Sequence, residues 1–176
     1  MDLKGKRAIV FVEANYQDLE FWYPVLRLRE EGVDVVIVGT GSAEGYTGRH
    51  GYPLPKVDTT ADKVNAKDFD AVIIPGGWAP DVLRRYESVL KIVRDAFAQK
   101  KVVGAICHAG SVLVSANVLR GKTATCVAAI KDDIINAGAE YVDREVVRDG
   151  NLITSRTPND LPAFMREIIK AMKESA

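Results

Sequence analysis

The sequence predicts a three-layer α/β/α sandwich, in which helices cover both faces of a mostly parallel central sheet. Short runs of apolar residues predict strands that are buried on both sides, and helical patterns of 10–15 residues separate them. No repeat or break in composition divides the 176 residues. This length suits one domain, for which about 100–200 residues are usual. We therefore expect a single domain over residues 1–176.

Strand and helix alternate in the first half of the chain. Apolar residues predict a strand over 8–13, and a helix over 19–31 follows, with Asn15 and Asp18 as turn or cap candidates. Gly32 is expected to end this helix, because glycine readily adopts the left-handed conformation found there. Further strands are predicted over 34–39 and 69–75. The Gly- and Pro-rich segment 41–60 between them predicts a loop with a small antiparallel hairpin.

The second half continues this alternation with shorter elements. A helix over 88–99 leads to a strand over 102–107, and the next helix ends near Ala116. A strand over 123–126, a helix over 132–137 and a strand over 140–143 are expected next. Asp149-Gly150 indicates a hairpin between two β-rich runs. The final helix is predicted over 161–173, with Asp160 as its N-cap.

Composition excludes several classes of protein. Lys and Arg together number 24, as do Asp and Glu, so the formal net charge is zero. Such a chain lacks the field that draws most nucleic-acid binders to phosphates, and we expect neither a specific nucleic-acid partner nor a membrane one. No apolar run approaches the ~20 residues of a membrane-spanning helix, and the N-terminus does not resemble a signal peptide. Two cysteines fit a reducing cytoplasm.

Ligands of parallel sheets bind at the carboxyl ends of the strands, which places candidate chemistry at residues 13–20, 76–81 and 107–110. Two phosphate-binding patterns fail here. Ala116 stands where a P-loop ending in Gly121-Lys122-Thr123 requires glycine, and Glu44 does so for a dinucleotide-binding motif that begins at Gly39. Cys107, His108 and Cys126 lack a fourth ligand for zinc, so we expect no metal and no cofactor.

Cys107 lies where a buried strand turns sharply into a helix. A nucleophile elbow needs small residues two positions before and after the nucleophile, and Ala105 and Ala109 meet this need. The positive end of the following helix would favour the thiolate. The alternative is a buried structural cysteine, a common role for an isolated Cys.

Several separate motifs resemble the PfpI family, the intracellular-protease and protein-deglycase type of the class I glutamine-amidotransferase-like superfamily. They are AICH at the elbow, PGG at the previous strand end, an early D-x-E, the central IKDDIINAGAEYVD and the late SRTPNDLPAFMRE. The resemblance extends from about Arg7 to Lys170. It implies the flavodoxin-like form of the sandwich and a catalytic cysteine.

The resemblance also implies roles for individual residues. Cys107 would be the nucleophile, His108 its neighbouring histidine, and Glu20 the carboxyl group that hydrogen-bonds the cysteine. Backbone N–H groups around Gly76 and Gly77, together with that of His108, would stabilise an oxyanion. Asp81 would reach the histidine of a neighbouring subunit.

Each of these residues also has a purely structural alternative. Glu20 could be a solvated acid in the first turn of its helix, and Asp81 an N-cap. Gly76 and Gly77 could form only a tight turn. His50, which lies in no motif, is expected in a surface loop, and Cys126 as a small core residue. The chain departs from the family's usual C-H-G-P by reading Cys107-His108-Ala109-Gly110, and it lacks an aromatic residue at 126–128.

The leading functional hypothesis is an enzyme that acts on reactive carbonyls, such as methylglyoxal or glycated protein side chains, through a Cys107 hemithioacetal. A cysteine peptidase is the second, by the Cys–His logic of covalent catalysis. A non-enzymatic redox sensor or holdase chaperone is the third. A glutamine amidotransferase is excluded, since it needs a histidine from the last third of the chain and none follows His108.

The implied role of Asp81 predicts a homo-oligomer, a dimer or a hexamer, with active sites near interfaces. Trp78, on the same loop, would be an apolar anchor for that contact. The alternative is a monomer with an exposed Trp78 beside its pocket.

Overall fold

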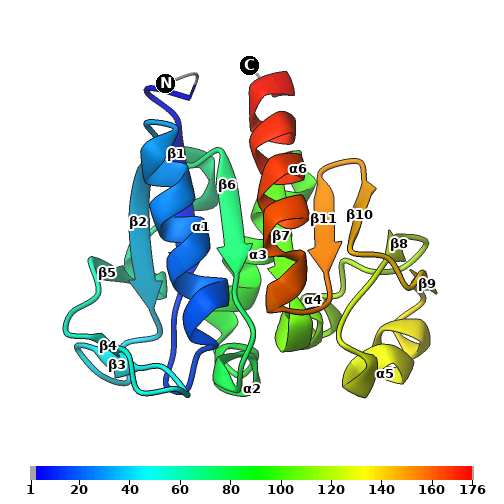
Figure 1. The fold of residues 1–176 in the computed structure, drawn as a ribbon, viewed down its shortest axis with the longest axis horizontal. Helices are drawn as coiled ribbons and strands as arrows, with labels where there is room; N and C mark the ends of the chain where they lie inside the picture. The colour runs from blue at the N-terminus through cyan, green and yellow to red at the C-terminus, as the bar shows by residue number, and fades with distance from the viewer. Residues whose placement is uncertain (1–2, 176) are drawn as a thin grey trace.

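A seven-stranded sheet forms the centre of the computed structural model, which describes residues 3–175 (Figure 1). Its strands are β1 (Arg7–Phe11), β2 (Asp34–Gly39), β5 (Thr59–Thr60), β6 (Ala71–Ile74), β7 (Val102–Ile106), β10 (Val146–Asp149) and β11 (Leu152–Ser155). They lie in the order β10-β11-β7-β6-β1-β2-β5, and only the pair β10–β11 is antiparallel. The predicted sandwich with a mostly parallel sheet is confirmed.

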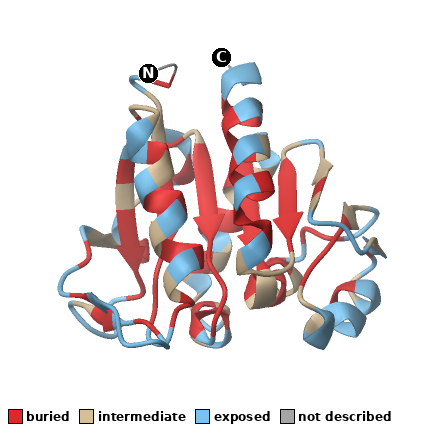
Figure 2. Cartoon of the chain, viewed as in Figure 1, coloured by how far each residue is buried: buried red, intermediate tan, exposed pale blue. Residues whose placement is uncertain are grey.

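Helices cover both faces of the sheet. On one face α1 (Asp18–Glu30) packs beside α6 (Leu161–Glu174), and on the other α3 (Glu87–Ala98) packs beside α4 (Gly110–Ala116) (Figure 1). The short helix α2 (Ala79–Leu83) contacts α4, and α5 (Lys131–Asn136) lies beyond the β11 side of the sheet. The buried residues follow the sheet and the inner sides of these helices (Figure 2).

Two pairs of short strands lie outside the main sheet. The predicted hairpin in the segment 41–60 is the antiparallel pair β3 (Tyr46–Thr47) and β4 (Pro53–Leu54). The other pair, β8 (Thr123–Ala124) and β9 (Glu140–Tyr141), is parallel. The 3-10 helices are η1 (Ala61–Lys63), η2 (Ala66–Asp68), η3 (Cys107–Ala109), η4 (Ala128–Ile130) and η5 (Pro158–Asp160).

The central strands are apolar because both of their faces are covered. Every residue of β6 and β7 is buried. Gly104 in β7 lets α6 approach the sheet, since a Cβ atom there would lie 2.8 Å from Cδ1 of Ile168. The helices therefore pack closely against β6 and β7, the two strands whose carboxyl ends were expected to carry site residues.

The helices differ from expectation in three respects, two of which concern their N-caps. Gln17, rather than Asn15 or Asp18, caps α1, because its side chain accepts a hydrogen bond from the Glu20 amide. Asp160 holds the N-cap position of α6, but its carboxylate binds Arg156 at 2.9 and 3.1 Å instead of an amide of the helix.

The third difference is α2 itself, which was expected as loop. Asp81 lies inside this helix, whose N-cap is Trp78, so the N-cap alternative for Asp81 is wrong.

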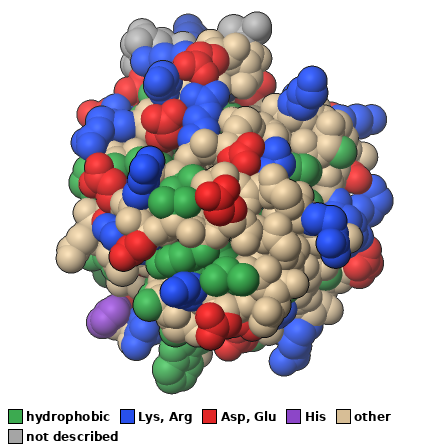
Figure 3. Space-filling view, turned by 90° about the vertical axis from the view of Figure 1, so that its right-hand side faces the viewer, with side chains coloured by type: hydrophobic (Ala, Val, Ile, Leu, Met, Phe, Trp, Pro, Cys, Tyr) green, Lys and Arg blue, Asp and Glu red, His purple; other side chains and the backbone are tan. Residues whose placement is uncertain are grey.

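The chain connections that follow β1 and β6 lead to opposite sides of the sheet. From β1 the chain leads to β2 on one side, and from β6 it leads to β7 on the other. Open parallel sheets place their ligand sites at such a switch point, outside the carboxyl ends of the strands. Within residues 3–175, no helix is both long enough and apolar enough to cross a bilayer. Basic and acidic side chains are interspersed on the face seen in Figure 3, without a large patch of one sign.

Candidate active site

Cys107 is the first residue of η3 and forms a strained turn directly after β7. Its φ of +62° lies in the left-handed region, which is unfavourable for a residue with a side chain and costs about 1–3 kcal/mol. Ala105 and Ala109, on either side, are buried, and a Cβ atom on Gly110 would lie 3.0 Å from Ile130. Small residues are therefore needed around this turn, and the turn leaves the Cys107 side chain half-buried.

The sulfur of Cys107 lies among backbone amides and one ring nitrogen. The amides of His108 and Gly77 hydrogen-bond the sulfur and lower its pKa. Nδ1 of His108 lies 3.4 Å from Sγ. Burial and the nearby charge of Glu20 outweigh the amides, and together they raise the pKa of Cys107 to about 12. In the single subunit, the thiol thus holds its proton while Glu20 is ionised.

Glu20 is fully buried in the first turn of α1, so it is not a solvated surface acid. Its Oε2 accepts a 2.9 Å hydrogen bond from the amide of Gly76. Burial raises the pKa of Glu20 to about 7, against the lowering effects of the Gly76 amide, Cys107 and the charge of Arg49. A carboxyl group that titrates near neutral pH is suited to proton transfer.

Gly76 brings the two groups together. A Cβ atom at this position would lie 2.5 Å from Oε2 of Glu20 and 2.7 Å from Cβ of Cys107. Because real Cβ atoms do not approach other atoms so closely, only glycine allows the carboxyl group and the cysteine to flank this backbone.

Backbone hydrogen bonds join the loop after β6 to the segment that follows β1. Gln17 donates its amide to the carbonyl of Gly76 at 3.1 Å, and Trp78 donates to the carbonyl of Asn15 at 2.9 Å. Gly77 has a φ of +79°, and a Cβ atom there would lie 2.4 Å from the backbone nitrogen of Gln17. The loop therefore needs glycine at both positions.

These contacts correct the expected set of oxyanion donors. The amide of Gly76 already donates to Glu20, and that of Trp78 donates to Asn15. The amides of Gly77 and His108 are the ones directed at the sulfur. Gly76 serves through its lack of a side chain and its bond to Glu20.

Two expected residues lie on the surface near this loop. The side chain of Trp78 is 60% exposed, and the guanidinium carbon of Arg49 lies 5.6 Å from its ring centroid. Asp81 is exposed in α2. Among the described residues, no carboxylate hydrogen-bonds the ring of His108. One subunit therefore brings together Cys107, His108 and Glu20, but leaves Asp81 apart.

Arg49 is a part of the site that the sequence did not single out. It follows the strand β3, in no motif, and its charge reaches Glu20 only because the hairpin folds back over α1. His50 beside it is exposed, with Nδ1 3.2 Å from the carboxylate of Asp18. Cys126 is buried, with 1% of its surface exposed. In the part of the chain that the structure describes, no three His, Cys, Asp or Glu side chains gather as a metal site would require.

Glu20 and Cys107 behave as one titrating pair. Burial raises the pKa of both groups, and the charge of Glu20 raises the pKa of Cys107 further, whereas the hydrogen bond from the thiol lowers the pKa of Glu20. Above about pH 7 the pair therefore carries one proton, which lies on the thiol. The proton can pass between sulfur and carboxyl oxygen as the sulfur attacks an electrophile. The amides of Gly77 and His108 then lie beside the atom that gains negative charge.

Known proteins resemble this chain over nearly its whole length. The sequence profile of the DJ-1/PfpI family matches residues 6–171. A protein of Pyrococcus horikoshii named deglycase PH1704 is 49% identical over 94% of this chain and 99% of its own length. YraA of Bacillus subtilis, whose name carries the term cysteine protease, is 41% identical over 96% of this chain and 98% of its own length.

A solved structure has the same fold. It is a two-domain protein of Anabaena variabilis with DJ-1/ThiJ/PfpI-like and ferritin-like domains, and it superposes with a TM-score of 0.92 at 42% identity. The match covers 94% of this chain and 47% of that one, so the chain spans about half the length of the two-domain protein.

Proposed function

Since the chain belongs to the DJ-1/PfpI family, we propose that it is a cysteine-dependent enzyme that acts on reactive carbonyls, such as methylglyoxal or early glycation adducts on proteins. The observation that carries this proposal is the contact of Glu20 and Cys107 across Gly76. In this proposal the carboxyl group of Glu20 transfers protons and the neighbouring sulfur of Cys107 is the nucleophile. A relative that is 49% identical carries the name deglycase, which supports this substrate class.

The reaction begins when the sulfur of Cys107 adds to the aldehyde carbon. The thiol proton passes to Glu20, and the carbonyl oxygen becomes an oxyanion beside the amides of Gly77 and His108. Each such donor can contribute about 3–4 kcal/mol. Glu20 returns the proton to this oxygen, which gives a neutral hemithioacetal.

Glu20 or His108 then moves a proton from the former aldehyde carbon to the adjacent carbon of methylglyoxal, while the hydroxyl proton of the hemithioacetal passes to the ketone oxygen on that adjacent carbon. This transfer converts the hemithioacetal into a thioester of a hydroxy acid. Water hydrolyses the thioester, releases the hydroxy acid and restores the thiol. The sum is one methylglyoxal and one water giving one hydroxy acid, and no metal or nucleotide takes part.

A peptidase is the second candidate. The 3.4 Å approach of Nδ1 of His108 to Sγ of Cys107 favours it, because a Cys–His pair can cleave an amide by covalent catalysis. The name of the Bacillus subtilis relative points the same way.

Two assays run side by side test the proposal. Steady-state formation of hydroxy acid from methylglyoxal, without cleavage of a dipeptide-coumarin substrate, is the expected result. Cleavage of the peptide with no turnover of methylglyoxal would replace the proposal by the peptidase. Turnover of neither substrate would contradict both enzymes and favour a redox sensor or chaperone.

The site is completed by a second copy of the chain in this proposal. A carboxylate that hydrogen-bonds His108 would fix its ring and tautomer, as the third member of a catalytic triad does. Asp81 is exposed and therefore available to a neighbouring subunit, and Trp78 beside it offers an apolar contact. We place the resulting homo-oligomer in the reducing cytoplasm, where the thiol of Cys107 is preserved.

A further inference from the structure

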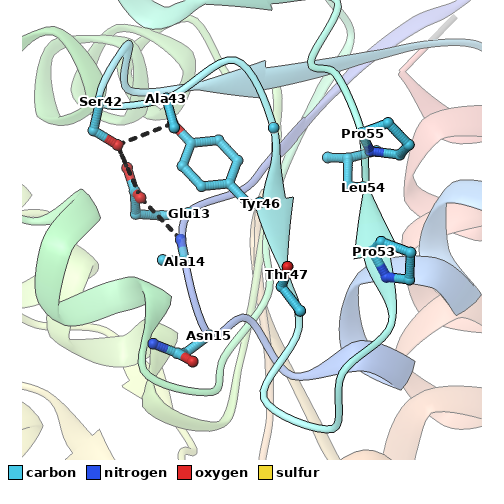
Figure 4. A pocket seen from close by; sticks show the side chains of 11 residues that line it. Glu13, Ala14, Asn15, Ser42, Ala43, Tyr46, Thr47, Pro53, Leu54 and Pro55 are labelled. Atoms are coloured by element: carbon cyan, nitrogen blue, oxygen red, sulfur yellow. Dashed lines mark hydrogen bonds between the residues drawn. The ribbon is translucent and has the colours of Figure 1, made fainter.

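A cavity lies between the segment that follows β1 and the β3–β4 hairpin (Figure 4). Its volume is about 540 Å³, within the range of small-molecule sites. One wall is polar and carries Glu13 and Ser42, and the opposite wall carries Pro53, Leu54 and Pro55, with the ring of Tyr46 between them. Cys107 and Glu20 are not among its lining residues.

The polar wall is built around a buried carboxylate. Glu13, at the end of β1, is 2% exposed. Its oxygens accept hydrogen bonds from the amide of Ala14 at 2.9 Å, from Oγ of Ser42 at 2.8 and 3.0 Å, and from the hydroxyl of Thr40. All of these donors are neutral, and among residues 3–175 no cationic side chain forms an ion pair with Glu13. Its negative charge is therefore stabilised by dipoles alone within this part of the chain.

The hydroxyl protons of this wall have a fixed direction. The hydroxyls of Thr40 and Ser42 each have one proton, and both protons point to Glu13. The hydroxyl of Tyr46 lies 3.2 Å from Oγ of Ser42 and 3.4 Å from Oγ1 of Thr40, so it can donate its proton to either oxygen. With its own proton turned inward, the hydroxyl of Ser42 offers only lone pairs to a ligand, and the hydroxyl of Tyr46 does the same when it donates to one of those oxygens.

The opposite wall suits an aliphatic chain. Leu54 is buried, and Pro53 and Pro55 present flat apolar surfaces beside it. The ring of Tyr46 fits here because β2 ends in Gly39, where a Cβ atom would lie 3.0 Å from that ring. An apolar stem can therefore lie along this wall while its polar end reaches Glu13.

We propose that this cavity binds an alkyl cation, namely a protonated primary amine or a guanidinium group on an aliphatic stem. The cationic head donates to the lone pairs of Ser42 and Tyr46, in front of the buried carboxylate of Glu13, and the stem lies against Leu54 and Pro55. Anions are repelled by the buried charge, and neutral alcohols leave it unbalanced. The ligand class follows from these acceptor hydroxyls and from the carboxylate behind them.

The cavity adjoins the active-site loop through Asn15, which lines it and has a φ of +59°. The Asn15 amide donates to Thr47 of the hairpin, and its carbonyl accepts from Trp78, both at 2.9 Å. A lysine or arginine side chain of a protein substrate and a free amine share the required chemistry.

Amide-resolved NMR titration with n-butylammonium chloride tests the proposal on the wild-type protein. We expect saturable shifts at the amides of Ala14, Ser42 and Thr47, and no such shifts with sodium butyrate. Affinity for n-butanol should be at least tenfold weaker. Equal binding of butanol or butyrate would overturn the proposal, and this comparison needs no variant to fold.

Glu13→Gln removes the charge while keeping the shape of the side chain. We expect it to weaken butylammonium binding at least tenfold, whereas Glu44→Gln, an exposed carboxylate on the same loop, should leave binding unchanged. Unaltered affinity in Glu13→Gln, or an equal loss in Glu44→Gln, would contradict the site.

Titration with Nα-acetyl-lysine N-methylamide separates the two sources of the ligand. Binding comparable to butylammonium indicates a protein-borne side chain, and binding at least tenfold weaker indicates a free amine. Failure of both compounds to bind contradicts the proposal.

Discussion

Glu20 and Cys107 flank Gly76, which bonds Glu20 through its amide and has no side chain to hold the two groups apart. The carboxyl group comes from α1 and the cysteine from the end of β7, so the contact depends on the sheet placing β6 between β1 and β7. Burial raises the pKa of both groups, and the charge of Glu20 raises the pKa of Cys107 further.

Gly76→Ala should lower turnover about 100-fold, because the new Cβ atom would displace both Glu20 and Cys107 and a 1 Å misplacement costs about that much. Gly150→Ala is the control. Unlike Gly76, Gly150 has a φ in the left-handed region, at +64°, but no atom lies within 4 Å of a Cβ added there. It should cost about 1 kcal/mol of stability and leave turnover unchanged. Similar rates for the two variants would show that the close approach is unimportant.

Glu20→Gln should move the pH profile of iodoacetamide alkylation at Cys107 to lower pH. The charge of Glu20 raises the pKa of Cys107, and glutamine carries no charge. Turnover should fall steeply at the same time, because glutamine cannot accept and return a proton. Alkylation rates between pH 6 and 11 give the profile. Unchanged profiles and turnover would make Glu20 a structural residue.

Stability should depend on pH through Glu20. Its folded-state pKa of about 7 lies above the ordinary 4.5, so the folded protein binds this proton more tightly than the unfolded chain does. The free energy of unfolding should therefore fall as the pH rises from 4 to 8, by about 3 kcal/mol from this group. Urea unfolding of wild type and Glu20→Gln measures the difference. A parallel pH dependence in the two proteins would contradict the raised pKa.

Local pattern was enough to predict the main strands and the elbow. The predicted strands at 34–39 and 102–107 are mostly apolar because most of their residues are buried, and small residues surround Cys107 because its left-handed turn is crowded. The helix α2 was missed because Gly76, Gly77 and Pro80 together resemble a loop. Proline nevertheless fits the first turn of a helix, where an amide has no partner.

Contacts between distant segments could not be predicted in the same way. Nothing around Glu20 in the sequence shows that it faces Cys107, and only the family resemblance paired them. The bond from the Gly76 amide to Glu20, which removes Gly76 from the oxyanion donors, depends on atomic geometry. Arg49 influences Glu20 through the fold of a hairpin loop that no motif marks.

Asp81→Ala and Trp78→Ala should weaken self-association, measured by sedimentation equilibrium. Trp78 is 60% exposed in one subunit, and burying its ring in an interface would stabilise the contact. Asp81→Ala should also lower turnover, because His108 would lose its orienting carboxylate. A fully active monomeric wild type would contradict the shared site and leave Asp81 as a surface residue of α2.

Hydroxy-acid formation from methylglyoxal by wild type, Cys107→Ser and Cys126→Ser tests the central claim most directly. Serine is nearly isosteric with cysteine but ionises poorly, so Cys107→Ser should fold and lose turnover. Cys126 is a buried core residue, and Cys126→Ser should keep nearly the wild-type rate. A tenfold loss of rate corresponds to about 1.4 kcal/mol in the activation free energy. Retention of more than a few per cent of the wild-type rate by Cys107→Ser would contradict Cys107 as the nucleophile.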